Sequence, residues 1–333
     1  MKLSEMFEQA PEIEIEGLCL DSRQAKPNDI YFCMSGIMFD GHDFVEDVIA
    51  KGVKAIVHAK PIEHMHKGVA YIQVENVNRT LNRIASLFYQ HPSRYMKVFG
   101  VTGTNGKSTI TSIIQDVYSH FHPCGYIGTI AIRYGDVELP PSLTTPDPIL
   151  IHKSMADMRA AGMEACALEV SSHGLELGRV MSVDFDIAIF SNLTYDHLDF
   201  HGTIENYLEA KKKLFTNLKS DGVAVLNRDD AYYQAFADCT NGRLVTYGIK
   251  HDSDYRAMDI QIQTDGSQFT LLHHEKSYTI KTNLVAMYNI YNLLGAIAGM
   301  CEAGIAIEDM LPYLASIKQI EGRMERIDEG QLF

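Results

Sequence analysis

The stretch GVTGTNGKST, from Gly100 to Thr109, decides the fold. It continues an apolar run, KVFGVT, that is typical of a buried strand, and a helical pattern begins near Lys107. A strand that passes through glycines into the start of a helix places backbone N–H groups and the positive end of the helix dipole around an anion. The stretch therefore predicts a phosphate-binding loop rather than an ordinary glycine-rich turn.

The residue types within this loop fit phosphate chemistry. Gly103 and Gly106 let the backbone approach a ligand closely, Lys107 supplies a positive charge, and the Ser108 hydroxyl can bind Mg²⁺. The spacing departs from the usual G-x-x-x-x-G-K-[ST] motif, because Val101 stands where the first glycine belongs. The loop is therefore a variant of the common form.

The chain after the loop alternates strand-like and helical segments. Near-continuous apolar runs, EACALEVS, FDIAIFSNL, GVAVLN and RLVTYGI, are separated by helical patterns that begin near Pro148, Ile204 and Asp230. Such runs predict a parallel sheet covered by helices on both faces. The segment DIQIQTDGSQFTLL differs, since its two alternating runs are joined by Asp265-Gly266. It predicts an antiparallel hairpin at the edge of the sheet.

The first part of the chain has its own pattern of short strands and helices. It includes IEGLCLDSR, DIYFCMSG and VAYIQVEN, and it ends at HPSRYMK, where Pro92 and polar neighbours indicate a linker. A length of 333 residues also favours two compact units. We predict an α/β fold with a small N-terminal α/β domain, residues 1–94. The central domain, residues 95–333, is predicted to have the mostly parallel sheet of a P-loop nucleotide hydrolase.

Composition limits the location and the partners. The formal net charge of −14 argues against a nucleic-acid-binding surface. The six cysteines form no C-x-x-C pair, the N-terminus lacks the apolar core of a signal peptide, and no apolar run approaches the roughly 20 residues of a membrane span. We expect a cytoplasmic protein with reduced thiols that binds neither nucleic acid nor membrane.

Two other classes of protein have partial motifs here. A GTPase is suggested by DFHG from Asp199 and NRDD from Asn227, but the spacing is wrong and Arg228 replaces the lysine that would pack on the base. A zinc peptidase is suggested by His197 and His201, yet Leu198 stands where H-E-x-x-H has its glutamate. Neither motif is complete.

Five further segments follow the loop in an order that resembles the Mur ligase family, and within it the MurE type. They are LEVSSHGLELGR, SNLTYDHLDFHGT, EAKKKLF, MYNIYNLLGA and EGRMERI. The form G-T-N-G-K-[ST] of the loop is similar to the nucleotide loop of the same family, and LDSRQAKPNDIYFCMSGIMFDGHDF extends the likeness into the first domain. Together these matches span both predicted domains.

The resemblance implies an ATP- and Mg²⁺-dependent amide ligase of peptidoglycan precursor synthesis. Its members phosphorylate the D-glutamate carboxylate of UDP-MurNAc-L-Ala-D-Glu, and an amino group then attacks the acyl phosphate. The resemblance implies an ATP site that begins with the loop itself and includes two residues from the later segments. The implied ATP-binding residues are Gly103, Thr104, Asn105, Gly106, Lys107, Ser108, Thr109, Asn289 and Arg323.

The same resemblance implies metal ligands and catalytic groups. Glu169 would hold Mg²⁺ together with Ser108, and His197 would bind a second magnesium ion. Lys107 and Lys211 would complete the catalytic set. In the helix after Thr203, Lys211 falls on the apolar stripe that faces the core, where a charged side chain is unexpected and needs an explanation. Burial favours a neutral amine that can react with carbon dioxide, and in similar enzymes this lysine is carbamylated and helps to place the metal; otherwise its amine extends to solvent.

Substrate contacts are implied on both predicted domains. Thr144, Thr145, Ser171 and Arg179 match positions that contact the UDP-MurNAc-dipeptide, and the guanidinium of Arg179 suits a carboxylate. Ser22 of the DSR segment matches a uridine-diphosphate contact, although a turn would use the same residue types.

The family carries a third, C-terminal ligase domain beyond EGRMERI, whereas this sequence stops at Phe333. We therefore expect a chain that binds its ligands but ligates poorly, with the incoming amino acid, meso-diaminopimelate or L-lysine, left open. The alternative is a non-catalytic module that binds nucleotide or UDP-precursor.

Overall fold

The computed structural model describes residues 1–36, 40–141 and 143–318, and the chain divides into two compact units. Unit 1 consists of Met1–Pro92, Pro148–Lys153 and Val180–Ser182, and unit 2 of Ser93–Asp147, Ser154–Arg179 and Val183–Phe333. Helix α5 (Pro148–Ala160) is divided between them. Within the described residues, no helix is long and apolar enough to cross a membrane.

Unit 1 is built on a parallel sheet of four strands in the order β1-β2-β3-β4. Strands β2 and β3 are buried on both faces, because Ile30, Phe32 and Val57 pack in one core while Tyr31 and Ile56 pack in the other. The elements of this unit are α1 (Leu3–Met6), β1 (Gly17–Cys19), η1 (Ser22–Gln24), β2 (Asp29–Phe32), η2 (Gly41–Phe44), α2 (Val45–Ala50), β3 (Ala55–His58), β4 (Ala70–Gln73) and α3 (Val77–Phe88). The 3-10 helix η3 (Pro92–Tyr95) follows.

Unit 2 is built on a sheet of eleven strands in the order β15-β14-β13-β12-β11-β10-β5-β9-β6-β7-β8. The strands are β5 (Lys97–Thr102), β6 (Cys124–Ile127), β7 (Ile132–Tyr134), β8 (Val137–Leu139), β9 (Ala165–Glu169), β10 (Ile187–Phe190), β11 (Val223–Asn227), β12 (Arg243–Gly248), β13 (Tyr255–Ile262), β14 (Ser267–His273) and β15 (Lys276–Thr282). Pairing is parallel from β13 to β6 and antiparallel at both ends. The predicted α/β class, the parallel sheet and the hairpin at Asp265-Gly266 are confirmed.

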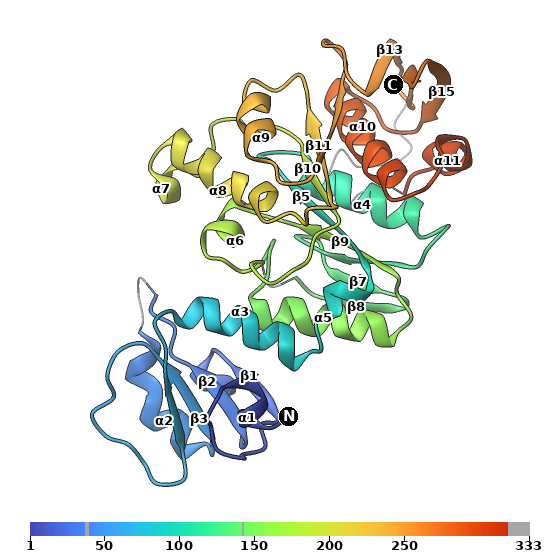
Figure 1. The fold of residues 1–333 in the computed structure, drawn as a ribbon. Coiled ribbons are helices and arrows are strands. Elements are labelled where there is room, and N and C mark those ends of the chain that lie inside the picture. Colours follow the sequence, from blue (N-terminus) through green and yellow to red (C-terminus); the bar gives the residue numbers. More distant parts are fainter. Residues whose placement is uncertain (37–39, 142, 319–333) are drawn as a thin grey trace, which may run out of the picture. The chain divides into compact units, whose positions relative to one another are not determined.

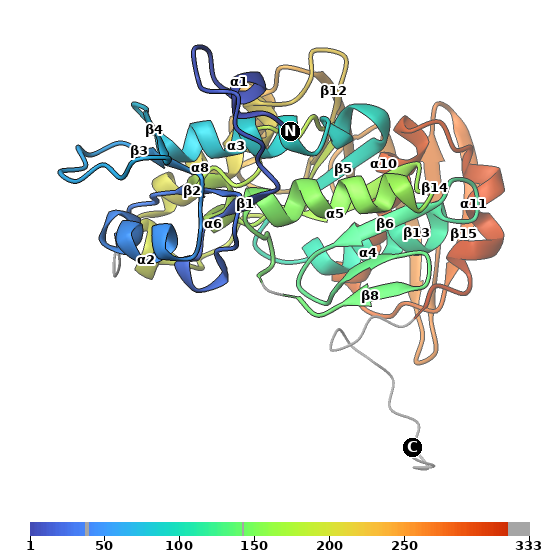
Figure 2. The same cartoon turned by 90° about the horizontal axis from the view of Figure 1, so that it is seen from below.

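Helices cover both faces of this sheet, as the buried apolar strands require. Figure 1 shows α4 and α10, which pack on each other, on one side of the strands, and α8 and α9 on the other. Figure 2 shows α11 beside the antiparallel strands β13 to β15. The helices are α4 (Lys107–Tyr118), α6 (Ser172–Glu176), α7 (Leu198–His201), α8 (Ile204–Thr216), α9 (Tyr233–Cys239), α10 (Met287–Glu302) and α11 (Ile307–Leu314).

The order of the strands positions the site. Strand β5 lies between β10 and β9, and the three strands are parallel. The loops that follow them therefore all leave the sheet at the carboxyl ends of the strands, in different directions. A crevice at such a point is the usual ligand site of an open α/β sheet. The loop 103–106, Glu169 and the segment 191–194 are therefore brought together at this edge.

Candidate functional site

The glycine loop has a backbone that only glycine adopts easily. Gly103 has φ +151, and Gly106, the residue just before helix α4, has φ +89. A Cβ at Gly103 would lie 1.9 Å from Ser191 Oγ, and one at Gly106 would lie 2.3 Å from Asn292 Oδ1. The loop thus passes between two neighbouring segments with no room for a side chain.

Replacing Gly106 by alanine should weaken nucleotide binding at least tenfold, because the new methyl group displaces either the loop or Asn292. Gly68→Ala is a matched control, since Gly68 has φ +88 and nothing lies within 4 Å of its added Cβ. That control should lose about 1 kcal/mol of stability from backbone strain and keep its affinity. Calorimetric titration with ATP measures the affinity, and thermal unfolding measures the stability. Equal losses of affinity in the two variants would contradict the packing argument.

The loop is fixed by the segment that follows β10. The N–H of Thr104 donates to the carbonyl of Asn192 at 2.8 Å, and the N–H of Asn105 donates to the Asn192 side chain at 3.0 Å. The Thr104 hydroxyl lies 3.2 Å from the hydroxyl of Tyr207 on helix α8. Sequence reasoning did not identify Asn192 or Tyr207 as supports of the loop.

Glu169, at the end of β9, has a fully buried carboxylate with four donors. Its Oε2 accepts hydrogen bonds from the hydroxyls of Ser108 (2.9 Å) and Thr129 (3.1 Å). Its Oε1 accepts from the hydroxyl of Tyr126 (2.5 Å) and the N–H of Thr129 (3.0 Å). Hydroxyl and carboxylate oxygens are the ligands that Mg²⁺ prefers, so Ser108 and Glu169 fit a magnesium site. Sequence reasoning predicted these two residues but missed Tyr126 and Thr129.

Three of the residues expected on the substrate side lie in one hydrogen-bonded group behind Glu169. The Thr145 hydroxyl donates to the Glu169 carbonyl at 2.8 Å and accepts from the N–H of Ser171 at 2.9 Å. The guanidinium of Arg179 donates to the Thr145 carbonyl at 2.8 Å. The hydroxyl of the fourth residue, Thr144, lies 3.1 Å from the Thr129 hydroxyl and can donate to it. The substrate-side residues and the acid are therefore linked.

Two lysine amines meet at the loop. Lys107 Nζ donates to the carbonyls of Gly103 (3.0 Å) and Thr104 (2.9 Å), and Lys211 Nζ donates to the same Gly103 carbonyl at 2.8 Å. Lys211 is 1% exposed, and its amine lies 4.5 Å from the centre of the Tyr207 ring. Burial, reinforced by the charge of Lys107, holds the pKa of Lys211 well below its usual value. An extension of Lys211 to solvent is therefore excluded.

His197 lies beside this group in a cluster of aromatic rings. It precedes helix α7 with φ +52, and its ring centre lies 4.9 Å from that of His173 and 6.2 Å from that of Tyr207. His201 is buried, and burial lowers its pKa. No group of three or more His, Cys, Asp or Glu side chains in the described ranges could hold a metal ion.

A cavity of about 650 Å³ opens beside the loop. Its lining includes Asn105, Gly106 and Thr109 on one side and Asn289 and Asn292 of helix α10 on another. The Asn289 amide is paired, since it donates to the Val285 carbonyl at 2.9 Å and accepts from Asn292 at 3.1 Å. Four of the predicted nucleotide residues, Asn105, Gly106, Thr109 and Asn289, therefore line one cavity.

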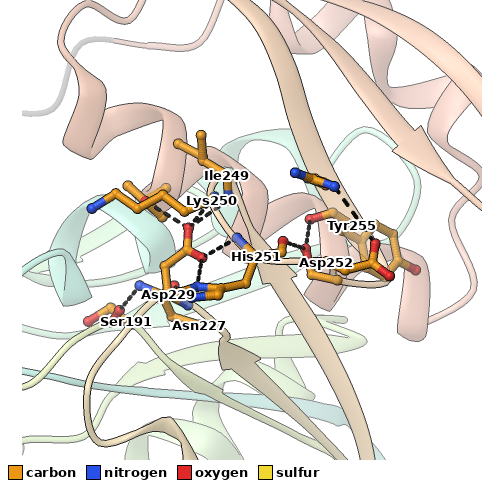
Figure 3. Close-up of polar contacts among 11 residues, drawn as sticks. Ser191, Asn227, Asp229, Ile249, Lys250, His251, Asp252 and Tyr255 are labelled. Atoms are coloured by element: carbon orange, nitrogen blue, oxygen red, sulfur yellow. Dashed lines mark hydrogen bonds and ion pairs between the residues drawn. The ribbon is translucent and has the colours of Figure 1, made fainter.

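Asp229 and Asp230 also line this cavity, although the NRDD motif was discounted. Figure 3 shows Asp229 beside the turn at Ile249, Lys250 and His251, and Asn227 bound to Ser191. The Asn227 amide donates to the Ser191 carbonyl at 2.8 Å. Asp229 and Asn227 of this motif therefore bind other residues of the chain and help to form the wall of the cavity.

The chain matches two family models. Residues 101–300 match the model described as Mur ligase middle domain, and residues 14–89 match the model described as Mur ligase family, catalytic domain. The chain belongs to the Mur ligase family. The family model thus covers the loop, Glu169, Lys211 and the cavity.

Similar Mur ligases are known from several bacteria. The chain is 38% identical over 327 residues to the UDP-N-acetylmuramoyl-L-alanyl-D-glutamate--2,6-diaminopimelate ligase of Geobacillus kaustophilus, covering 96% of this chain and 66% of that protein. It is 34% identical to the ligase of the same name from Listeria monocytogenes, covering 100% and 70%. The chain therefore spans about two thirds of the length of these relatives.

Solved structures show the same fold. A structure of UDP-N-acetylmuramoyl-L-alanyl-D-glutamate--2,6-diaminopimelate ligase matches 99% of this chain and 69% of its own with a TM-score of 0.85 and 27% identity. The MurF ligase of Thermotoga maritima, in complex with ADP, matches 96% of this chain and 69% of its own with a TM-score of 0.68 and 21% identity.

Ser22 belongs to unit 1, where it lines a separate cavity of about 360 Å³ with Asp21, Arg23 and Tyr31. The Asp21 side chain accepts from the Arg23 N–H at 3.0 Å, as expected of a turn. Arg323 lies outside the described residues.

Proposed function

We propose that this chain holds the ATP-binding and UDP-precursor-binding parts of an amide ligase of peptidoglycan precursor synthesis. The observation that carries the proposal is the convergence of Ser108, Glu169 and Lys211 on one glycine loop, through hydrogen bonds of 2.9 and 2.8 Å. The names of the similar ligases favour 2,6-diaminopimelate as the amino acid that is added to UDP-MurNAc-L-Ala-D-Glu.

In the proposed reaction, the D-glutamate carboxylate is phosphorylated, and the amino group attacks the acyl phosphate and displaces phosphate. ATP with Mg²⁺ would supply the phosphoryl group and neutralise its charge. The N–H groups at the start of helix α4 orient the phosphates, and Lys107 exchanges the carbonyls of Gly103 and Thr104 for phosphate oxygens. Ser108 and Glu169 would hold the magnesium ion, and Asn289 would face the adenine.

We further propose that Lys211 is carbamylated. Its lowered pKa favours the neutral amine, whose nitrogen lone pair can attack carbon dioxide. The N–C bond forms, one C=O electron pair moves to oxygen, and an amine proton leaves to solvent. The resulting anion, together with His197, would offer ligands to a second divalent ion.

Arg179 and Ser22 are proposed to bind the UDP-precursor. Burial lowers the pKa of the Arg179 guanidinium, although an arginine keeps its proton at neutral pH. Its bond to the Thr145 carbonyl uses one nitrogen and leaves other N–H groups for a carboxylate. The cavity at Ser22 in unit 1 is proposed to hold the uridine diphosphate.

Tyr126→Phe should weaken the Mg²⁺ dependence of nucleotide binding by about 10- to 100-fold, because a partner that orients a metal ligand typically has an effect of this size. Its hydroxyl is a donor to Glu169 Oε1, and the variant keeps the ring in the buried strand. Titrating Mg²⁺ at fixed ATP measures the effect. Tyr118→Phe, another buried tyrosine of unit 2, is the control and should match the parent. A Tyr126→Phe chain with unchanged Mg²⁺ dependence would show that Thr129 and Ser108 orient the acid without it.

A direct assay separates the two candidate activities. The chain is incubated with ATP, Mg²⁺, UDP-MurNAc-L-Ala-D-Glu and 2,6-diaminopimelate. Release of phosphate together with tripeptide product supports the ligase. Binding of nucleotide and precursor without product supports the alternative, a non-catalytic binding module. Binding of neither ligand removes both.

A further inference from the structure

The carboxylate of Asp229 is a buried charged group on the cavity wall that the proposed function leaves without a role. It follows strand β11 and its side chain is 3% exposed. Burial alone raises the pKa of a carboxyl group, but the hydrogen bonds that Asp229 accepts hold its pKa well below the usual range. These hydrogen bonds therefore favour the ionised carboxylate.

The donors to Asp229 come from two segments far away in the sequence. Its Oδ2 accepts from the N–H groups of Ile249 (2.7 Å) and Lys250 (2.8 Å), and from the hydroxyl of Tyr291 on helix α10 (2.8 Å). Its Oδ1 accepts from the N–H of His251 at 2.8 Å, and the His251 ring nitrogen Nδ1 lies at the same distance. Figure 3 shows the three consecutive N–H groups of the turn around the carboxylate.

This arrangement excludes direct reading of a base by Asp229. A carboxylate has about four lone-pair positions, and five donors already surround this one. An aspartate that binds guanine directly, as the GTPase motif would require, needs both carboxylate oxygens free for the base. Asp229 acts on the cavity through the protein groups that it holds.

Tyr291 connects Asp229 to the nucleoside side of the cavity. It lies on helix α10 between Asn289 and Asn292, and all three residues line the cavity. The same helix faces the loop so closely that a Cβ on Gly106 would meet Asn292 Oδ1 at 2.3 Å. A shift of the first turns of α10 would therefore change the nucleoside side of the cavity, whereas the N–H groups of Thr104 and Asn105 keep their own hydrogen bonds to Asn192.

We propose that Asp229 is a positioning residue for the nucleoside end of the site. Its charge joins the turn at Ile249–His251 to Tyr291, and so holds Asn289 and Asn292 in place beside the loop. This inference rests on the proposed binding of ATP. It predicts that Asp229 contributes to affinity for the nucleoside and not to affinity for the phosphates, which contact the loop.

The test compares ATP with inorganic tripolyphosphate, each titrated calorimetrically into the parent and into Asp229→Asn. The variant keeps the shape but removes the charge and presents N–H groups to donors. We expect the dissociation constant for ATP to rise at least tenfold and that for tripolyphosphate to stay within twofold. Asp254→Asn is the control, since Asp254 accepts from the N–H (2.8 Å) and hydroxyl (2.6 Å) of Thr246 next to the same turn. It should bind both ligands as the parent does.

Tyr291→Phe keeps the test decisive if Asp229→Asn does not fold. This variant should weaken the binding of ATP severalfold and leave the binding of tripolyphosphate unchanged. If Asp229→Asn does fold, the effects of the two substitutions should not add in the double variant. Equal weakening of both ligands, or none in either variant, overturns the positioning role. A parent chain that binds neither ligand would instead remove the proposed function on which the inference rests.

Discussion

Lys211 should take up a carboxyl group when the chain is incubated with ¹³C-labelled bicarbonate near pH 8. The prediction follows from its position, since the amine is 1% exposed, meets the second amine of Lys107 at the Gly103 carbonyl and has a pKa well below the usual value for lysine. A neutral amine reacts with carbon dioxide, whereas an ammonium group does not. A ¹³C spectrum should show one carbamate signal that disappears in Lys211→Met.

The neighbouring lysine gives the matched control. Lys212 lies on the same helix but pairs with Glu209 at 2.7 Å, and this contact raises its pKa. Lys212→Met should therefore keep the signal. With nucleotide present, the parent should bind two Mn²⁺ ions and Lys211→Met one, as counted by electron paramagnetic resonance. A parent without the signal, or a Lys211→Met chain that still binds two ions, would end the argument for a second metal.

Glu169→Gln should reduce the gain in nucleotide affinity that Mg²⁺ provides by about 100-fold, or about 3 kcal/mol. The substitution keeps the size of the side chain but removes the charge, and hydrogen bonds to a charged group are each worth about 1.5–3 kcal/mol. Four donors point at this buried carboxylate, so the amide also leaves some of them without an acceptor. Affinity for ATP is measured with Mg²⁺ and with a chelator.

The control for Glu169 is an acid at the opposite edge of the same sheet. Asp186 precedes β10 and accepts the Val98 N–H at 2.8 Å and the Lys219 amine at 3.1 Å. Asp186→Asn should lose stability and keep its Mg²⁺ response. If both variants lost that response equally, the effect would come from destabilised folding and not from a metal ligand.

Local patterns were sufficient to predict the centre of the fold. Strand β5 spans Lys97–Thr102 and helix α4 begins at Lys107, both as predicted, because a buried parallel strand and a glycine turn leave a strong pattern in a short stretch. The apolar stripe of α8 likewise predicted that Lys211 faces inward. The short strands β6, β7 and β8 were missed. Of these, β8 is exposed throughout and has no alternating pattern of burial.

The supports of the site could not be predicted because they are distant in sequence. Tyr126 and Thr129 donate to an acid about forty residues away, and no spacing rule connects them to it. Asp229 was noticed only as part of a GTPase-like motif. Its partners, the turn at Ile249–His251 and Tyr291, join it only once β11, β12 and α10 have packed.

The central claim of the account is that magnesium and nucleotide bind together at the glycine loop. The most direct test is a crystal structure of the chain with Mn²⁺ in place of Mg²⁺ and a non-hydrolysable ATP analogue, with anomalous scattering to locate the metal. We predict a manganese peak in bonding contact with Ser108 Oγ and Glu169 Oε2, phosphates on the N–H groups of the loop, and adenine in the cavity lined by Asn289. A bound analogue with no metal peak beside Glu169, or an analogue bound away from the loop, would contradict the account.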